Sequence, residues 1–130
     1  MKSAAFLAAL AAVAVLASPA LADGDAAKGK KVFNKCMSCH DAVEAKDKVG
    51  PNLVGVVGRT AGTLESFATK YSQAMKDAGA GGLVWDEANI AEYLKDPKAK
   101  IPNNKMAFAG LKKDDEIENV IAYLKADPKP

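Results

Sequence analysis

The chain has 130 residues, of which 49% are hydrophobic and 26% charged, and its formal net charge is +2. This length fits one domain with a modest core rather than several domains. The near-balanced charge, the single arginine and the lack of a basic run argue against binding to nucleic acid, so we expect no nucleic-acid partner.

The first 22 residues have the pattern of a cleaved secretory signal peptide. Lys2 gives a positive start, an apolar run extends from Ala4 to Leu16, and Ala20-Leu21-Ala22 forms a small-residue cleavage pattern. The apolar run is shorter than the roughly 18 residues of a spanning helix, which argues against a retained membrane anchor. We predict a signal peptide over 1–22 and one exported, soluble domain over 23–130.

The pentapeptide Cys36-Met37-Ser38-Cys39-His40 carries the strongest chemical signal and follows a predicted first helix, which should end near these cysteines. Two cysteines separated by two residues and followed by histidine are the attachment signature of a c-type haem. Each thiol can form one thioether with a haem vinyl group, and His40 can give the iron an axial nitrogen. The chain has no other cysteine or histidine, so a four-ligand zinc site lacks ligands.

The remaining elements are predicted to be helices joined by long loops. The glycine-rich segment 50–62 is typical of a loop, and a weaker helical stripe follows over 67–78. A third helix should begin at Asp86, a good N-cap, and end before Pro97. A last helix should begin at the acidic cluster that starts with Asp114. We therefore expect an all-α domain of about four to five helices wrapped around one haem.

A second axial ligand of the iron must come from a methionine, since no further histidine exists. Met1 leaves with the predicted leader, and Met37 lies inside the attachment loop. Met75 lies on the apolar stripe of a predicted helix, which favours a place in the core. Met106 lies in an irregular segment that can present its side chain from the face opposite His40. We predict that Met106 is the sixth ligand.

With these features the chain resembles the class I cytochromes c, and most closely the bacterial, long-loop type called cytochrome c2. The resemblance runs from about Gly24 to Lys125. It depends on several motifs in the family's order: Cys36–His40, Gly50–Leu53, Gly58-Arg59, Trp85, Glu92–Leu94, Pro97, Lys105–Gly110 and Ile121–Leu124.

The resemblance implies one haem c, bound covalently through Cys36 and Cys39, with His40 and Met106 as the axial ligands. It also implies that the Pro51 carbonyl accepts a hydrogen bond from the other ring nitrogen of His40.

Other matched residues are implied to surround the ring. Tyr71 and Trp85 would bond a buried propionate, and Arg59 would offset its charge. Tyr93 would lie near the methionine sulfur, and Phe108 beside the exposed haem edge. Relatives often have Gly-Thr where this chain has Asn103-Asn104, and the hydrogen-bond partner of the Asn104 amide is left open.

The function implied is that of a soluble periplasmic one-electron carrier rather than an enzyme. Two filled axial positions leave no site for a substrate. The expected donor is a quinol–cytochrome c oxidoreductase, and the expected acceptor is a photosynthetic reaction centre or a terminal cytochrome oxidase. We expect a monomer that docks transiently through a lysine-rich face near Cys36 and Phe108. The lysines proposed for this face are Lys35, Lys100, Lys105 and Lys112.

Two alternatives stay open from the residues alone. The first is a haem enzyme or gas-binding sensor in which the sixth ligand is absent or displaceable. The second is a thiol–disulfide oxidoreductase that uses Cys36 and Cys39, although no strand pattern of a thioredoxin-like fold surrounds them. Carbon monoxide binding to the reduced protein separates the first from an electron carrier, and the absence of covalent haem would indicate the second.

Overall fold

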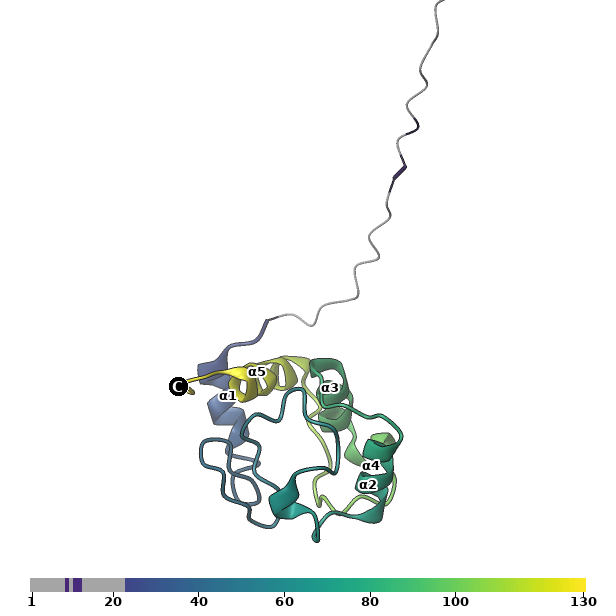
Figure 1. Cartoon of the computed structure of the whole chain (residues 1–130). Coiled ribbons are helices and arrows are strands. Elements are labelled where there is room, and N and C mark those ends of the chain that lie inside the picture. The colour runs from purple at the N-terminus through teal and green to yellow at the C-terminus, as the bar shows by residue number, and fades with distance from the viewer. Residues whose placement is uncertain (1–8, 10, 13–22) are drawn as a thin grey trace, which may run out of the picture.

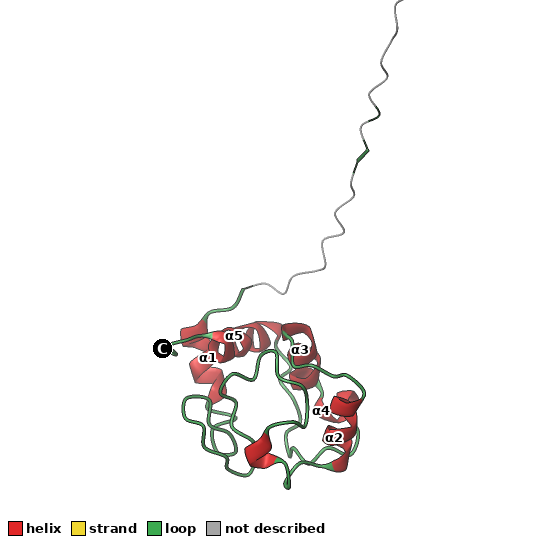
Figure 2. Ribbon diagram, viewed as in Figure 1, coloured by secondary structure: helices red, strands yellow, loops and turns green. Residues whose placement is uncertain are grey.

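The protein is described here by a computed structural model, which covers residues 9, 11, 12 and 23–130. The leader predicted over 1–22 lies almost wholly outside the described residues, so this boundary stays a prediction. Over residues 23–130 the fold is all-α, as predicted, and the one β-contact is a single bridge between Thr60 and Val84 (Figures 1 and 2). The elements are α1 (Ala26–Phe33), a 3-10 helix (Glu65–Phe67), α2 (Gln73–Ala80), α3 (Glu87–Lys95), α4 (Pro97–Lys100) and α5 (Asp114–Lys125).

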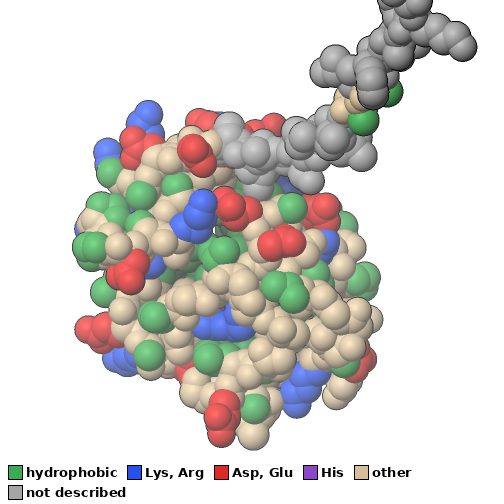
Figure 3. Space-filling model, turned by 45° about the horizontal axis from the view of Figure 1, so that its top comes forward, with side chains coloured by type: hydrophobic (Ala, Val, Ile, Leu, Met, Phe, Trp, Pro, Cys, Tyr) green, Lys and Arg blue, Asp and Glu red, His purple; other side chains and the backbone are tan. Residues whose placement is uncertain are grey.

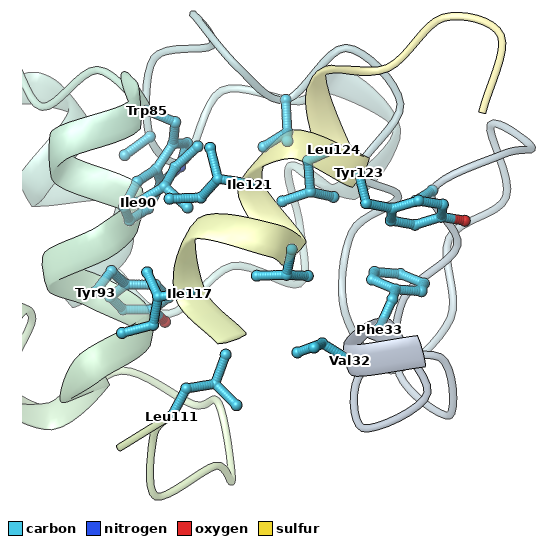
Figure 4. Close-up of a cluster of buried hydrophobic side chains, with 14 of the residues drawn as sticks. Val32, Phe33, Trp85, Ile90, Tyr93, Leu111, Ile117, Ile121, Tyr123 and Leu124 are labelled. Atoms are coloured by element: carbon cyan, nitrogen blue, oxygen red, sulfur yellow. The ribbon is translucent and has the colours of Figure 1, made fainter. Parts of the chain in front are cut away.

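The first and last helices lie side by side and join the two ends of the domain (Figure 1). Gly29 on α1 permits this approach, because a Cβ there would collide with the backbone carbonyl of Asn119 and lie 2.8 Å from the Tyr123 Cβ on α5. Next to this crossing the rings of Phe33 and Tyr123 stand 5.3 Å apart (Figure 4). The contact ties the segment that leads into the cysteines to the C-terminal helix.

Helix starts follow the capping residues in the sequence. The side chain of Asp25 accepts the Lys28 N–H at the start of α1, and Asp86 accepts the Asn89 N–H at the start of α3. Pro97 ends α3, as predicted, and also occupies the first turn of α4, where its missing N–H costs nothing. Helix α5 begins at Asp114 with three acidic residues in its first turn, where the helix dipole favours negative charge.

Two boundaries differ from the predicted ones. The stripe over 67–78 is not one helix, because Ser72 adopts an extended conformation and its side chain accepts the Met75 N–H, which starts α2 at Gln73. The 3-10 helix ahead of it ends at Phe67. Helix α1 ends at Phe33, and hydrogen-bonded turns rather than helix carry the chain on to His40.

The core lies on both sides of α5, which packs against α1 and against α3, and Figure 4 shows apolar side chains from these helices facing one another. Val120 and Pro97 are the largest side chains that are fully buried. Met75 packs against the edge of this cluster, in line with the core position expected for it. Among the described residues no helix has the length and apolarity that crossing a membrane requires.

Candidate haem site

The two cysteines lie on a compact turn that follows α1 directly. The Cys36 N–H donates to the Phe33 carbonyl over 2.8 Å, and the His40 N–H donates to the Cys36 carbonyl over 2.9 Å. Both thiols are free and partly exposed. Burial raises the pKa of the Cys36 thiol, although Lys35 opposes this effect. The turn places two thiols and one imidazole within five residues, as attachment of a c-type haem requires.

His40 is held in one orientation by its neighbours. Its Nδ1 atom lies 2.7 Å from the Pro51 carbonyl oxygen. A carbonyl only accepts hydrogen bonds, so Nδ1 carries the proton and Nε2 keeps a lone pair for a metal. Burial lowers the pKa of the imidazole, and the Pro51 carbonyl acts in the opposite sense. A neutral ring with a free Nε2 is the form that binds iron.

Gly50 is a part of this site that the sequence reasoning left without a role. A Cβ at this position would collide with the Cε1 atom of the His40 ring and lie 2.8 Å from its Nδ1. The Gly50 N–H also donates to the Cys39 carbonyl over 2.9 Å. The sequence signal for this contact was the glycine itself, because glycine is often found where the backbone must closely approach another group.

Asp47 holds the same loop from its other side and was also missed. Its Oδ1 atom accepts the Asn52 backbone N–H over 2.9 Å and the Asn52 side-chain amide over 2.8 Å. Hydrogen bonds from the Ser66 hydroxyl and then the Asn52 N–H hold the pKa of this carboxyl below its ordinary value. These bonds close the chain around Pro51, the residue that contacts His40.

Met106 is placed by two polar contacts. The Tyr93 hydroxyl on α3 points at its sulfur over 3.9 Å, and its backbone N–H donates to the Asn104 Oδ1 atom over 2.8 Å. Burial raises the pKa of Tyr93 to about 12, so its hydroxyl stays protonated and able to donate at neutral pH. Trp85 packs against Tyr93 with 4.9 Å between the ring centroids. The structure thus brings together three of the predicted site residues, Trp85, Tyr93 and Met106, and joins Asn104 to them.

Arg59 and Tyr71 form a separate polar region. The Arg59 guanidinium donates to the Asn52 and Val54 carbonyls over 2.9 and 2.8 Å, and no ion pair of the described residues includes it. Burial lowers the pKa of Arg59, while nearby Tyr71 raises it. The Tyr71 hydroxyl accepts the Leu64 N–H over 3.2 Å, which leaves its own hydrogen to donate. A half-buried cation without a carboxylate partner, beside a free hydroxyl donor, suits an anionic group such as a propionate.

Phe108 lines a surface groove that also contains charged side chains. The groove is lined by Lys35, Phe108, Gly110, Leu111, Lys112, Lys113 and Glu116. Lys35 pairs with Glu116 at 3.4 Å, and Lys95 pairs with Asp114 at 3.6 Å, so both lysines lie against the acidic first turn of α5. On the face that Figure 3 shows, acidic and basic side chains are mixed rather than separated.

The residues present fit a haem. The candidate donors are two thiols, an imidazole with a free nitrogen and the predicted Met106 thioether. The Arg59 guanidinium, which is in no ion pair of the described residues, would suit a propionate. Apolar side chains that are only partly buried offer surface for a porphyrin ring to cover: Cys36, Leu53, Val57, Ala74, Met75, Ala78, Leu83, Ala91, Leu94, Met106 and Phe108. Within residues 23–130 no group of three or more His, Cys, Asp or Glu side chains could hold a bare metal ion. Iron held by a porphyrin does not need a cluster of protein ligands, because the ring nitrogens already bind it.

A helical domain with this attachment turn and this donor set is a c-type haem protein. The chain belongs to the cytochrome c family, whose model, described as Cytochrome c, matches residues 26–126. The family binds one haem c covalently, and this confirms the predicted cofactor and the predicted resemblance. The chain is therefore a c-type cytochrome, a class of protein that carries electrons.

Individual relatives agree with this assignment. The chain is 50% identical over 111 residues to a cytochrome c2 of Agrobacterium tumefaciens (strain II Chrys), with 83% of this chain and 98% of that protein covered. It is 53% identical over 102 residues to a cytochrome c-550 of Nitrobacter winogradskyi, with 78% and 89% covered. Among solved structures it is similar to cytochrome cH from Methylobacterium extorquens, at 44% identity and a TM-score of 0.69, with 78% of this chain and 98% of that chain covered.

Proposed function

We propose that the protein is a periplasmic one-electron carrier whose haem is attached through Cys36 and Cys39 and ligated by His40 and Met106. The observation that carries this proposal is that each candidate ligand has its own fixed partner. Pro51 orients the His40 ring at 2.7 Å, and the Tyr93 hydroxyl faces the Met106 sulfur at 3.9 Å. A haem with both axial positions filled exchanges electrons and leaves no open position for oxygen or a substrate.

The protein's part in this function is to hold both ligands in one arrangement. Methionine is a neutral thioether that favours the reduced metal, so His/Met ligation raises the reduction potential. The Tyr93 hydroxyl would support the sulfur, and the unpaired Arg59 would offset a propionate charge. Rigid packing around a buried cofactor keeps structural change on electron transfer small.

Partners would dock at the groove beside Phe108 and Cys36. The proposed donor is a quinol–cytochrome c oxidoreductase, and the proposed acceptor is a photosynthetic reaction centre or terminal cytochrome oxidase, as in the cytochrome c2 type that the chain resembles. The charges of Lys35 and Lys100 are already balanced by Glu116 and Glu92. Lys105 and Lys112 donate to backbone carbonyls instead, so we assign the attraction of an acidic partner chiefly to these two.

Export to the periplasm rests on the signal peptide predicted over 1–22. The domain that remains, 23–130, would act as a soluble monomer. Gly24 supports this boundary, because a Cβ there would collide with the backbone of Glu118 on α5, so the chain is already part of the fold at this residue.

Carbon monoxide binding tests the closed coordination. The reduced wild-type protein should show almost no change in its visible spectrum under carbon monoxide at neutral pH, whereas reduced Met106→Ala should bind it readily. If the wild-type protein binds carbon monoxide readily, the function as an electron carrier is contradicted, and a gas-binding or catalytic function is favoured. If wild type and Met106→Ala bind carbon monoxide to the same extent, Met106 is not the sixth ligand.

A further inference from the structure

The side-chain amide of Asn104 makes three hydrogen bonds in two directions. Its Nδ2 donates to the carbonyl of Pro97, the first residue of α4, over 3.0 Å and to the carbonyl of Ile101, the residue that follows α4, over 2.8 Å. Its Oδ1 accepts the Met106 N–H over 2.8 Å. One side chain therefore joins the end of a helix to the backbone of the proposed sixth ligand.

Helix α4 is a firm support for this contact. Pro97 is fully buried and Ile101 is only 4% exposed. The Lys100 ammonium binds the Asn89 side chain at 2.9 Å and pairs with the Glu92 carboxylate, both on α3. A residue that bonds to α4 is consequently bonded, through α3, to the body of the protein.

The segment that carries Met106 has few other attachments. Past the methionine the Ala109 carbonyl accepts the exposed Lys112 ammonium over 3.1 Å, and the Leu111 N–H donates to the Leu94 carbonyl over 2.7 Å. Between them, the Phe108 N–H bonds only to Met106 itself, over 3.0 Å. The contact of Tyr93 with the sulfur is long, at 3.9 Å, and a thioether is a weak acceptor. Asn104 is thus the main anchor on the N-terminal side of Met106.

We infer that Asn104 is a positioning residue that sets how often Met106 leaves the iron. Its donor side, which binds α4, holds the segment in place, and its acceptor side transmits that hold to the Met106 backbone. This inference rests on the proposed ligation by Met106. It assigns the protein backbone as the hydrogen-bond partner of the Asn104 amide, which the sequence left open.

Imidazole is a suitable probe, because it occupies the sixth position of ferric haem only when Met106 has moved away. Loss of the three hydrogen bonds should make the open arrangement easier to reach, so ferric Asn104→Ala should bind imidazole at least about tenfold more tightly than wild type. The binding constants come from titrations followed in the visible spectrum.

Two variants separate positioning from general stability. Asn104→Asp keeps an acceptor for the Met106 N–H but cannot donate to the Pro97 and Ile101 carbonyls, which its carboxylate would repel, so it should bind imidazole more tightly than wild type. Asn119→Ala removes an amide on α5 that accepts the Asp25 N–H over 2.8 Å and makes no hydrogen bond to the segment of Met106 among the described residues, so it should leave imidazole affinity within about twofold of wild type.

Each possible result of these titrations either supports or overturns the inference. Wild-type imidazole affinity in Asn104→Ala overturns the inference, and so does an equal rise in Asn119→Ala. If Asn104→Ala binds imidazole more tightly but Asn104→Asp has the affinity of wild type, the hydrogen bond to the Met106 N–H is sufficient, and the anchoring to α4 is overturned. A failed proposed function is recognised separately, because Met106→Ala would then keep the weak near-red absorption of sulfur-ligated ferric haem and the imidazole affinity of wild type.

Discussion

At the scale of single residues, the geometry around His40 depends on a glycine as much as on the imidazole itself. The ring is bonded to Pro51 on one edge and covered by the Gly50 backbone on another. The two residues adjoin in sequence, so one short loop sets both the direction and the clearance of the ring.

Gly50→Ala is expected to displace the His40 ring. The added Cβ would lie 2.8 Å from Nδ1, and the ring cannot yield without losing its bond to Pro51. We expect a loss of about 1–3 kcal/mol in unfolding free energy by urea titration, together with an altered low-spin haem spectrum. Gly81→Ala is the matched control, since a Cβ there meets only ordinary contacts at 3.4 Å or more. Equal effects of the two substitutions would refute this role for Gly50.

Asn103 has a backbone φ of +64°, the left-handed region in which glycine and asparagine are tolerated and branched residues are strained. Asn103→Val should therefore lower the unfolding free energy by roughly 1–2 kcal/mol, whereas Asn103→Gly should change it by only a few tenths. Thermal unfolding of both variants provides the measurement. A valine variant as stable as the glycine variant would contradict the assigned conformation.

At the scale of elements, the contact between α1 and α5 holds the attachment turn against the rest of the domain. Gly29→Ala sets two effects against each other. Alanine favours a helix by about 1 kcal/mol, but its Cβ would meet the Asn119 carbonyl of α5 and force the helices apart. The collision involves backbone, so we expect net destabilisation of about 1–3 kcal/mol in urea. As a control, Lys30→Ala, at an exposed position of the same helix, should change the free energy of unfolding by no more than about 0.5 kcal/mol. Net stabilisation by Gly29→Ala would contradict the prediction, because it would show that the helices separate easily.

The loop at Asp47 gives a pH dependence of known sign. Hydrogen bonds lower the pKa of Asp47 in the folded protein below its ordinary value of 3.8. Stability from this carboxylate is therefore fully present above about pH 4 and is lost as the pH falls through the lower folded pKa. Asp47→Asn should be less stable than wild type at pH 7, and the difference should shrink below pH 3.8. A difference that stays constant between pH 7 and pH 3 would show that the charge of Asp47 has no part.

At the scale of the whole molecule, the docking face is the property with the widest consequence. Lys112→Gln should slow association with an acidic electron-transfer partner severalfold at low ionic strength, because among the described residues its ammonium pairs with no carboxylate and donates to carbonyls instead. Lys35→Gln should have a smaller effect, since Glu116 already balances that charge. Stopped-flow rates at several salt concentrations test this, and rates that do not depend on salt would contradict electrostatic guidance.

Much of the architecture follows from short-range patterns in the sequence. Asp86 and Asp114 marked the beginnings of α3 and α5 because capping residues and acidic first turns act locally. The single helix predicted over 67–78 was wrong, because the Ser72 side chain caps a new helix, which periodicity alone does not reveal.

The haem attachment motif could be read directly, because its chemistry requires adjacent residues. The contacts of Gly50 with His40, and of Asn104 with α4, could not be predicted in this way. They depend on how loops fold back onto the chain. Such contacts appear only once the chain is seen in three dimensions.

We propose that this chain carries one covalent haem whose two axial positions are filled by His40 and Met106. Mass spectrometry and the absorption spectrum of the same purified protein test it most directly. We expect the mass of residues 23–130 plus one haem, and a ferric spectrum with the weak near-red absorption of sulfur ligation. A mass without haem, or a haem spectrum that lacks this absorption at neutral pH, would contradict it.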